Sequence, residues 1–597
     1  MPTIVHKAEA YLTLIESVVR EAGADPVRLS EAELREYAPR PVVGGVRFRS
    51  RFPDGVDREF AVLAQRGASL RAPLIALCHP QPPFLAWPHV EKDGVLCLPG
   101  EGATIAIDNP KGVIENHLGQ AAKLIEDCAA GHLEADFLRE ANSYWNQAKS
   151  ADGPACLSLL ELQGPSREIA IWRTNSHIYC AENEHDVRSW VRNVLSEPDK
   201  TVEVDRGVLL WLNTPLHPRE FPKCAADMYE LARRKAPAAV PILDNLAGRP
   251  GVDTLAMVVA APTPTGPFCG GILVSAPRTA ARYGRVKQPL SKGFRPGHVP
   301  PQIAVSRFFA GTPVNRATVE RIDALWVHGR THDKGAAELR GKAVAILGCG
   351  SVGANVAVLL AQAGVGNLVL VDPDTLSSAN ICRHPLGARH VSRFKADALA
   401  EDLKRRLPHT EIVALSKKWE QLDTDSFRKV EAADLVVSAI GHAGSELTLN
   451  AALREVGVPV LYGWLEPYAA AAHAVLIGTS GPCFRCCLDD KCIPVLRATE
   501  WPADSELRQE PACGSVFQPY GSVDTQNGAA LAAQLALDVL LKQRGEPQHR
   551  VRVVEKHRIT ALGGKWSERW LDATKREEGG FTWTTSDEVR KSCTERH

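Results

Sequence analysis

The stretch K-A-V-A-I-L-G-C-G-S-V-G, from Lys342 to Gly353, decides the fold of the C-terminal half of the chain. An apolar strand leads into a glycine-rich turn, and a helical run through Ala363 follows. A second apolar strand, Leu368 to Val371, comes next. This alternation of strand, turn and helix predicts βαβ units and a parallel sheet, the architecture of many nucleotide-binding domains.

The turn and the end of the second strand carry residues suited to a nucleotide. Gly348, Gly350 and Gly353 allow backbone amides to approach a phosphate, and the following helix presents its positive end. Asp372 lies 19 residues after Gly353, where a carboxylate can bind ribose hydroxyls. These residues favour a nucleotide site, and on their own they leave NAD and ATP both open.

The next segment, D-P-D-T-L-S-S-A-N-I-C-R-H, runs from Asp372 to His384 and distinguishes between NAD and ATP as the nucleotide. It resembles the signature of the ThiF/MoeB and ubiquitin-activating adenylating enzymes. The resemblance implies ATP as the nucleotide, Asp372 as the ribose ligand, and Asn380, Arg383 and Lys395 as phosphate contacts. Such cations would stabilise the charge that develops as pyrophosphate leaves. The alternative is that Arg383 and Lys395 are ordinary surface charges.

One position departs from that family. Gly441 stands where the relatives have a magnesium-binding Asp. The family implies Mg²⁺ with ATP, so either another carboxylate, with Asp374 as the candidate, holds the metal, or adenylation is impaired. The family also uses an arginine upstream of the first strand, often from a dimer partner. Arg316, Arg321 and Arg330 are the candidates for that role.

Four cysteines cluster in P-C-F-R-C-C-L-D-D-K-C, at Cys483, Cys486, Cys487 and Cys492. The C-x-x-C pair resembles half of the structural zinc site of the same family. Tetrahedral zinc needs four ligands, however, and no second C-x-x-C pair follows towards the C-terminus. The sequence leaves zinc and simple packing both open, and we favour packing.

Cys513 precedes G-S-V-F-Q-P-Y and an apolar helix that we expect over Asn527 to Leu541. A loop thiol at a helix entrance near a cationic site is favoured as a thiolate nucleophile. Relatives place a cysteine at this point, and in several of them it bonds covalently to a carrier protein. The resemblance therefore implies a catalytic Cys513, and a buried structural cysteine is the alternative.

The segment W-P-H-V-E-K-D-G-V-L-C-L, from Trp87 to Leu98, resembles the active-site segment of ubiquitin-conjugating enzymes, where an Asn precedes the catalytic Cys by eight residues. His89 takes the place of that Asn and lies eight residues before Cys97. The resemblance implies that Cys97 carries a thioester and that His89 donates a hydrogen bond to an oxyanion or acts as a base. A cysteine in an apolar run is otherwise usually a core residue.

A length of 597 residues predicts several domains, and we expect three. Residues 1–148 read as a ubiquitin-conjugating-enzyme-like α+β domain that closes with a helical stretch from about Pro110 to Gln147. Residues 149–300 form a middle region without a motif, and its Pro- and Gly-rich end marks a domain edge. Residues 301–597 form the Rossmann-like adenylation domain. The expected fold class is multidomain α/β plus α+β.

Charge and composition exclude some functions. Lys+Arg and Asp+Glu are both 70, so no overall positive field favours nucleic acid or an anionic membrane as a partner. No run of about 18 apolar residues occurs, and the N-terminus lacks an export signal, so we expect a cytoplasmic protein. The 15 cysteines are then better explained as thiols, metal ligands or nucleophiles than as a disulfide framework.

A conjugating-like module joined to an activating module resembles the fused enzymes of bacterial CBASS anti-phage operons. That resemblance implies adenylation of the C-terminus of a cGAS-like nucleotidyltransferase with a ubiquitin-like tail, capture by Cys513, transfer to Cys97 and delivery to a target amine. It also implies a homodimer. The alternatives are a sulfur-carrier-activating adenylyltransferase and a nucleotide-sensing scaffold without catalysis.

Overall fold

The computed structural model describes residues 2–67, 71–98, 108–150, 153–196, 202–277, 290, 293–295, 298–330, 332–502, 508–509, 516–517, 519–542 and 546–586. Three main sheets, one of four strands and two of eight, organise these residues. The chain divides into two compact units, each of which is described by itself. The first unit comprises Met1–Leu157, Leu162–Ile178 and Asp205–Glu320, and the second comprises Ser158–Glu161, Tyr179–Val204 and Arg321–His597.

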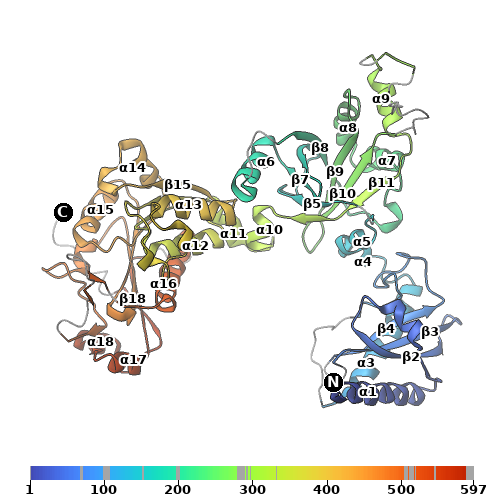
Figure 1. The fold of residues 1–597 in the computed structure, drawn as a ribbon, viewed down its shortest axis with the longest axis horizontal. Helices are drawn as coiled ribbons and strands as arrows, with labels where there is room; N and C mark the ends of the chain where they lie inside the picture. The colour runs from blue at the N-terminus through green and yellow to red at the C-terminus, as the bar shows by residue number, and fades with distance from the viewer. Residues whose placement is uncertain are drawn as a thin grey trace. The chain divides into compact units, whose positions relative to one another are not determined.

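The N-terminal region builds a four-stranded antiparallel sheet in the order β1-β2-β3-β4 (Figure 1). Strand neighbours in space are neighbours in sequence, so the sheet is a simple meander. Within β3, the side chains from Phe60 to Ala64 are buried. The elements are α1 Pro2–Glu21, β1 Val27–Arg28, α2 Glu31–Leu34, η1 Arg35–Tyr37, β2 Val42–Arg51, β3 Asp57–Gln65, β4 Leu74–His79, α3 Pro110–Ala129, α4 Asp136–Arg139 and α5 Ala141–Gln147.

Two long helices cover this small sheet. Ile15 of α1 and Ile114 of α3 share one buried cluster with Val62 of β3. The helical stretch expected from Pro110 to Gln147 is broken into α3, α4 and α5, and Gly131 has a φ of +74° just after α3 ends. A left-handed residue ends an α-helix, because it turns the next peptide out of the helical path. An α+β domain is present, with a shorter closing helix than the sequence predicted.

The middle region is built on an eight-stranded sheet in the order β11-β10-β9-β8-β6-β7-β5-β12. β11 and β12 lie beyond residue 300 and complete this sheet, and the boundaries 1–148, 149–300 and 301–597 remain predictions. The elements are β5 Ala155–Ser158, β6 Arg167–Arg173, β7 His177–Ala181, α6 Glu184–Trp190, η2 Val191–Leu195, β8 Val204–Trp211, η4 Pro218–Glu220, α7 Ala225–Lys235, η5 Pro237–Ala239, α8 Val240–Ala247, β9 Thr254–Ala261, β10 Phe268–Ser275, α9 Pro301–Phe308, β11 Val314–Ala317 and β12 Val319–Arg321.

The C-terminal region carries the second eight-stranded sheet, in the order β15-β14-β13-β16-β17-β18-β22-β24. The strands from β15 to β17 pair in parallel, as the sequence predicted, and β18, β22 and β24 add antiparallel strands. The elements up to β17 are α10 Ala324–Gly329, α11 Lys334–Leu339, β13 Ala343–Leu347, α12 Gly353–Ala363, β14 Asn367–Val371, η7 Ser378–Asn380, η8 Ala388–His390, α13 Lys395–Arg406, β15 Glu411–Leu415, η9 Trp419–Gln421, α14 Thr424–Glu431, β16 Leu435–Ser438, α15 Ala443–Glu455 and β17 Val460–Leu465.

The remaining elements close this region. They are η10 Pro467–Ala469, β18 Ala471–Ile477, η11 Phe484–Cys487, β19 Thr499–Glu500, β20 Arg508–Gln509, β21 Val516–Phe517, α16 Ser522–Leu540, β22 Gln548–Val553, α17 Lys556–Ala561, β23 Lys565–Trp566, α18 Glu568–Thr574 and β24 Thr582–Thr585. α16 begins five residues before the helix expected from Asn527. No helix among the described residues is long and apolar enough to cross a membrane.

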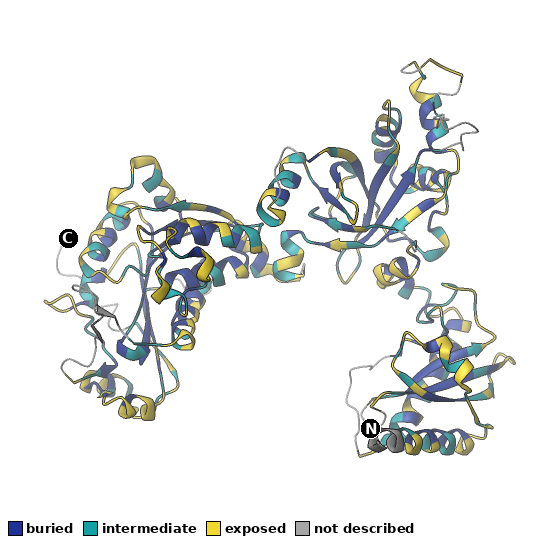
Figure 2. Cartoon of the chain, in the orientation of Figure 1, coloured by how far each residue is buried: buried dark blue, intermediate teal, exposed yellow. Residues whose placement is uncertain are grey.

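Both faces of the parallel sheet are covered by helices. Val344 and Ile346 of β13 belong to a cluster with α12, α13 and α16, whereas Ala345 and Leu347 belong to one with α14 and α15. Figure 2 shows buried residues concentrated in the strands and on the helix faces against them. Strands buried on both faces read as continuous apolar runs, which is why the sequence around β13 predicted a parallel sheet.

A tight contact between α5 and β10 gives a test of this packing. A Cβ on Gly270 would lie 2.4 Å from the ring of the fully buried Trp145. We expect Gly270→Ala to lower the free energy of unfolding by about 1–3 kcal/mol, because the extra methyl overpacks the core. Gly119 of α3 has no atom within 4 Å of its would-be Cβ, so Gly119→Ala should stabilise the chain by roughly 0.5–1 kcal/mol. Denaturant unfolding that ranks the two variants in the opposite order would refute this packing.

Candidate active site

The glycine loop between β13 and α12 is so tightly packed that two of its positions accept only glycine. Gly348 has a φ of +88°, and a Cβ on Gly353 would lie 1.9 Å from the Gly348 carbonyl oxygen. Gly350 differs, because nothing lies within 4 Å of its would-be Cβ. Gly348 and Gly353 therefore fix the shape of the turn, and Gly350 faces open space, where backbone amides can approach a phosphate.

Asp372 holds this loop from the end of the neighbouring strand. Its carboxylate accepts the Cys349 N–H at 2.6 Å and the Asp374 N–H at 2.8 Å. The side chain is 5% exposed, and this burial raises the pKa of the Asp372 carboxyl. Asp372 thus lies where the sequence predicted a ribose ligand, and it also braces the glycine loop.

The predicted phosphate contacts surround the same loop. Lys395 is the first residue of α13, and its Nζ lies 2.9 Å from Asp374 Oδ2. The guanidinium of Arg383 lies over the ring of Tyr520, 4.8 Å from its centre, and the Tyr520 hydroxyl is 3.1 Å from Ser351 Oγ in the loop. Tyr520 therefore links Arg383 to the glycine loop.

Asn380 has a local structural contact. Its side-chain oxygen accepts hydrogen bonds from the N–H and hydroxyl of Ser377, at 3.3 and 3.0 Å, in the capping box of a short 3-10 helix. The phosphate role of Asn380 remains a prediction, and the structure adds that this residue orders the segment leading to Arg383.

Two further residues support the loop and were not predicted from the sequence. His384 donates from Nε2 to the Cys349 carbonyl at 2.9 Å, and its Nδ1 accepts the Leu386 N–H. Burial lowers the pKa of His384, which keeps the imidazole neutral for this arrangement. Asn355 of α12 donates to the carbonyls of Ser351 and Arg383. His384 is the last letter of the quoted motif, which is the signal that could have identified it.

A cavity of about 400 Å³ opens beside the glycine loop. Its lining includes Gly350, Ser351, Gly441, Glu446 and Cys492. A Cβ on Gly441 would meet no atom within 4 Å, so the cavity has free space beside this residue. A cavity of this size and lining can hold a small ligand.

Glu446 is the carboxylate in this wall. It is 8% exposed, accepts the Ser438 hydroxyl at 2.8 Å, and has its pKa raised by burial. Asp374, the carboxylate proposed for Mg²⁺ from the sequence, is paired with Lys395 instead. No group of three or more His, Cys, Asp or Glu side chains that could hold a metal occurs among the described residues. Magnesium bound to a nucleotide needs only one or two protein carboxylates, so Glu446 fits such a site.

The four cysteines between Cys483 and Cys492 do not form one cluster. Cys483 and Cys486 approach to 3.8 Å between their sulfurs, and Cys487 packs against an apolar cluster. Cys492 is exposed and lines the cavity beside the glycine loop. Cys492 therefore differs from the other three in lining the cavity beside the glycine loop. Cys513 lies outside the described residues.

In the N-terminal region, Cys97 is exposed in a short segment after β4. Its N–H donates to the His89 carbonyl at 2.9 Å, and bridges join Val90 to Leu96 and Ala76 to Val95. Cys128 of α3 contrasts with it, because burial raises the pKa of that thiol to about 12. Exposure and a fixed backbone make Cys97 the thiol suited to nucleophilic chemistry.

The backbone carbonyl of His89 accepts the hydrogen bond from Cys97, and the imidazole ring of His89 lies near two carboxylates. The residue has a φ of +60°, its N–H donates to the Tyr144 hydroxyl at 3.2 Å, and Nε2 lies 3.2 Å from Asp136. Nδ1 lies 3.6 Å from Glu140. A non-glycine residue in this conformation needs support from its surroundings, and these contacts supply it. His89 thus positions the Cys97 segment, and its predicted direct role in catalysis remains a prediction.

Two of the three candidate upstream arginines are committed to local contacts. Arg316 donates to the carbonyls of Ala148 and Pro222. Arg321 makes a buried bidentate pair with Asp323, with both N–O distances at 2.8 Å. Using either guanidinium elsewhere would break these bonds, and the role of an upstream arginine remains a prediction for Arg316, Arg321 and Arg330 alike.

Comparison with known families matches the two regions that carry these sites. The ThiF family matches residues 327–572, and the prokaryotic E2 family B matches residues 46–152. The chain carries a ThiF domain and a prokaryotic E2 domain. The predicted fold class is thereby confirmed, with the Rossmann-like ThiF domain in the C-terminal half and the E2 domain in the N-terminal part.

Several proteins and solved structures resemble the chain over part of its length. The ATP-dependent ubiquitin transferase-like protein Cap2 of Pseudomonas aeruginosa is 30% identical over 38% of this chain and 41% of the relative. The protein of the same name from Vibrio cholerae is 26% identical over 39% of this chain and 41% of the relative. A crystal structure of Escherichia coli MccB with ATP shares 21% identity over 37% of this chain and 63% of that one, with a TM-score of 0.29. The chain therefore spans about two fifths of the length of the Cap2 proteins it matches.

The close approach within the glycine loop gives a test of the ThiF domain. Gly353→Ala should lower the stability of this domain by about 3 kcal/mol or more, because its methyl would overlap the Gly348 carbonyl. Gly350→Ala is the matched control and should unfold within about 0.5 kcal/mol of the wild type, because its methyl enters open space. The loop geometry is wrong if thermal unfolding shows the two variants to be equally stable.

Proposed function

We propose that this chain uses ATP to activate the C-terminal carboxylate of a partner protein, carries the partner as a cysteine thioester and transfers it to an amine. The observation that supports this most directly is the combination of two sites in one chain. A braced glycine loop with Lys395 and Arg383 lies in the ThiF domain, and the exposed Cys97 lies in the E2 domain. Two similar proteins are named ATP-dependent ubiquitin transferase-like protein, which agrees with this proposal.

The first step is adenylation in the cavity beside the glycine loop. An oxygen of the partner's carboxylate bonds to the α-phosphorus of ATP, and the bond to pyrophosphate breaks. Loop amides contact the phosphates, Asp372 binds the ribose, and Lys395 and Arg383 balance the charge that develops on the leaving group. Glu446 would hold Mg²⁺, which would supply further neutralisation of that charge.

The second step moves the acyl group to sulfur. A thiolate bonds to the carbonyl carbon of the acyl adenylate, AMP leaves, and the thiol proton passes to solvent or a base. Cys513 is the thiol that the sequence predicts for this step. Cys492 is a second candidate, because its thiol lines the cavity in which the adenylate would form.

The third step brings the acyl group to Cys97. Its thiolate bonds to the thioester carbonyl carbon, the first thiol leaves, and a target amine later displaces Cys97 to give an amide. Fusion of the two domains makes this exchange intramolecular, with an effective concentration on the order of millimolar. His89 keeps the Cys97 segment in place during these exchanges.

We further propose that the partner is a cGAS-like nucleotidyltransferase whose tail resembles that of ubiquitin, that the enzyme is a homodimer and that it acts in the cytoplasm during antiviral defence. The resemblance to fused CBASS enzymes supports the partner, and the balanced charge of the chain agrees with a protein rather than a nucleic acid. The geometry of the sites in the two domains does not depend on these assignments.

Lys395 gives a direct test of adenylation. Lys395→Ala should reduce partner-dependent ATP–pyrophosphate exchange by about 10²-fold or more and weaken MgATP binding in calorimetry, because a cation at the phosphates is lost. Lys404→Ala, in the last turn of the same helix, is the control and should leave both values near those of the wild type. Equal exchange rates for the two variants would remove Lys395 from the site.

Cys97 separates activation from conjugation. Cys97→Ala should retain pyrophosphate exchange and lose the conjugate on denaturing gels, whereas Cys513→Ala should lose the first thioester. Cys492→Ala, examined in parallel, identifies the first acceptor if Cys513→Ala still forms that thioester. Normal conjugation by Cys97→Ala would contradict the relay and favour an activating enzyme of the sulfur-carrier type.

A further inference from the structure

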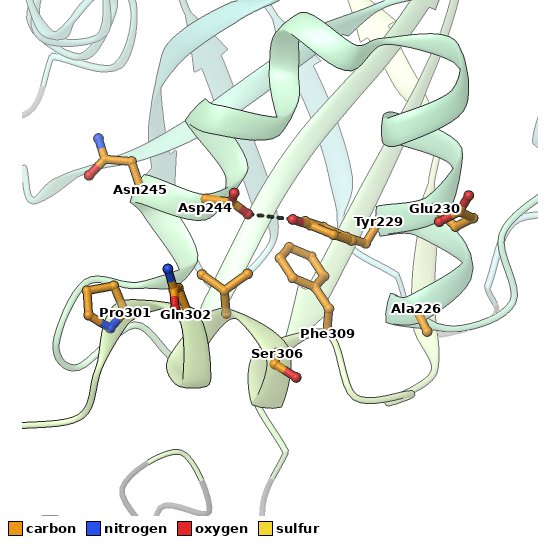
Figure 3. A pocket seen from close by; sticks show the side chains of 10 residues that line it. Ala226, Tyr229, Glu230, Asp244, Asn245, Pro301, Gln302, Ser306 and Phe309 are labelled. Carbon is orange, nitrogen blue, oxygen red and sulfur yellow. Dashed lines mark hydrogen bonds between the residues drawn. The ribbon is translucent and has the colours of Figure 1, made fainter.

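The middle region contains a second cavity, of about 560 Å³, which belongs neither to the glycine-loop site nor to the segment around Cys97. Helices α7, α8 and α9 surround it, and Figure 3 shows side chains from all three helices converging on one space. This volume exceeds that of one amino-acid side chain and lies within the range of ligand sites in proteins.

One wall of this cavity is aromatic. The rings of Tyr229 and Phe309 stack with centres 4.7 Å apart and planes tilted by 33°. Phe309 is 5% exposed and Val305 of α9 is 9% exposed, so both are anchored in the core of the middle region. Such a wall suits the methylene stem of a long side chain or the flat face of a guanidinium.

Tyr229 also forms a polar pair with Asp244 in this lining. Tyr229 donates its hydroxyl hydrogen to Asp244 Oδ1 at 2.7 Å, and Figure 3 shows these two side chains meeting across the cavity. Burial, helped by Asp244, raises the pKa of Tyr229 to about 12, so the phenol keeps this proton at neutral pH. The hydroxyl donor is therefore used internally, and the oxygens of the pair can accept further hydrogen bonds.

Charge in the cavity is negative. Glu230 and Asp244 line it, and no Lys or Arg does so among the described residues. Arg233, which is not part of the lining, lies 3.4 Å from Glu230 on the exposed side of α7. Arg233 offsets part of the charge of Glu230 and leaves Asp244 as the main anionic group inside.

We propose that this cavity binds a basic side chain, Arg or Lys, from a segment of a partner polypeptide. An aromatic wall with carboxylates and without a competing cation matches the chemistry of such a side chain in shape and charge. Pro301 and Glu230 are exposed lining residues, so the cavity is accessible from the surface, as a side chain of another polypeptide requires. The site would give the chain a docking point for a protein that is separate from its two reactive centres.

Calorimetry on the full chain without ATP tests this site and is independent of the proposed enzymatic function. The probes are the blocked tripeptide Ac-Ala-Arg-Ala-NH₂, its Lys counterpart and its uncharged norleucine counterpart. We expect the Arg or Lys peptide to bind at least tenfold more tightly than the norleucine peptide. Asp244→Asn, which keeps an acceptor for Tyr229, should weaken binding by about tenfold, because the bound cation loses its anionic partner.

Glu338→Gln, an exposed carboxylate outside the cavity, is the control and should bind like the wild type. Equal binding of the norleucine peptide, or unchanged binding by Asp244→Asn, would overturn the proposal. Agmatine that binds as tightly as the Arg peptide would also overturn it, because the site would then select a small amine rather than a polypeptide. Unfolding temperatures of the variants identify any loss of binding that is due to misfolding.

Discussion

The candidate nucleotide site depends on one buried carboxylate that accepts hydrogen bonds from two backbone amides. Asp372 binds the Cys349 N–H of the glycine loop and the Asp374 N–H of its own segment, so it joins the ends of β13 and β14. Lys395 is positioned through Asp374, and the shape of the loop depends on Gly348 and Gly353. A preorganised set of donors of this kind stabilises charge without moving during the reaction, which is what adenylation requires.

Burial and exposure distinguish the thiols of the chain from one another. Cys349 and Cys128 are buried, and burial raises the pKa of each thiol, so both are poor nucleophiles although Cys349 lies within the glycine loop. Cys97 and Cys492 are exposed, the first on a segment fixed by His89 and the second at the cavity. Exposure and local backbone support therefore make Cys97 and Cys492 better candidate nucleophiles than the two buried thiols.

Local patterns allowed much of the fold to be predicted. The apolar runs around β13 and β14 predicted the parallel sheet because both of its faces are buried, and the motif ending at His384 predicted which loop would face a nucleotide. The break after α3 at Gly131 was missed, since helical periodicity continues across it. The contacts of His384 and the position of Cys492 in the cavity lining depend on tertiary packing, which spacing alone does not determine.

The most direct test is mass spectrometry of the intact chain after incubation with ATP, Mg²⁺ and the partner protein. The account predicts a mass increase equal to the partner minus one water, removed by hydroxylamine and mapped to a cysteine peptide, with Cys97 as the final site. A chain that hydrolyses or binds ATP but gains no hydroxylamine-sensitive mass would contradict the claim that it carries its partner as a thioester.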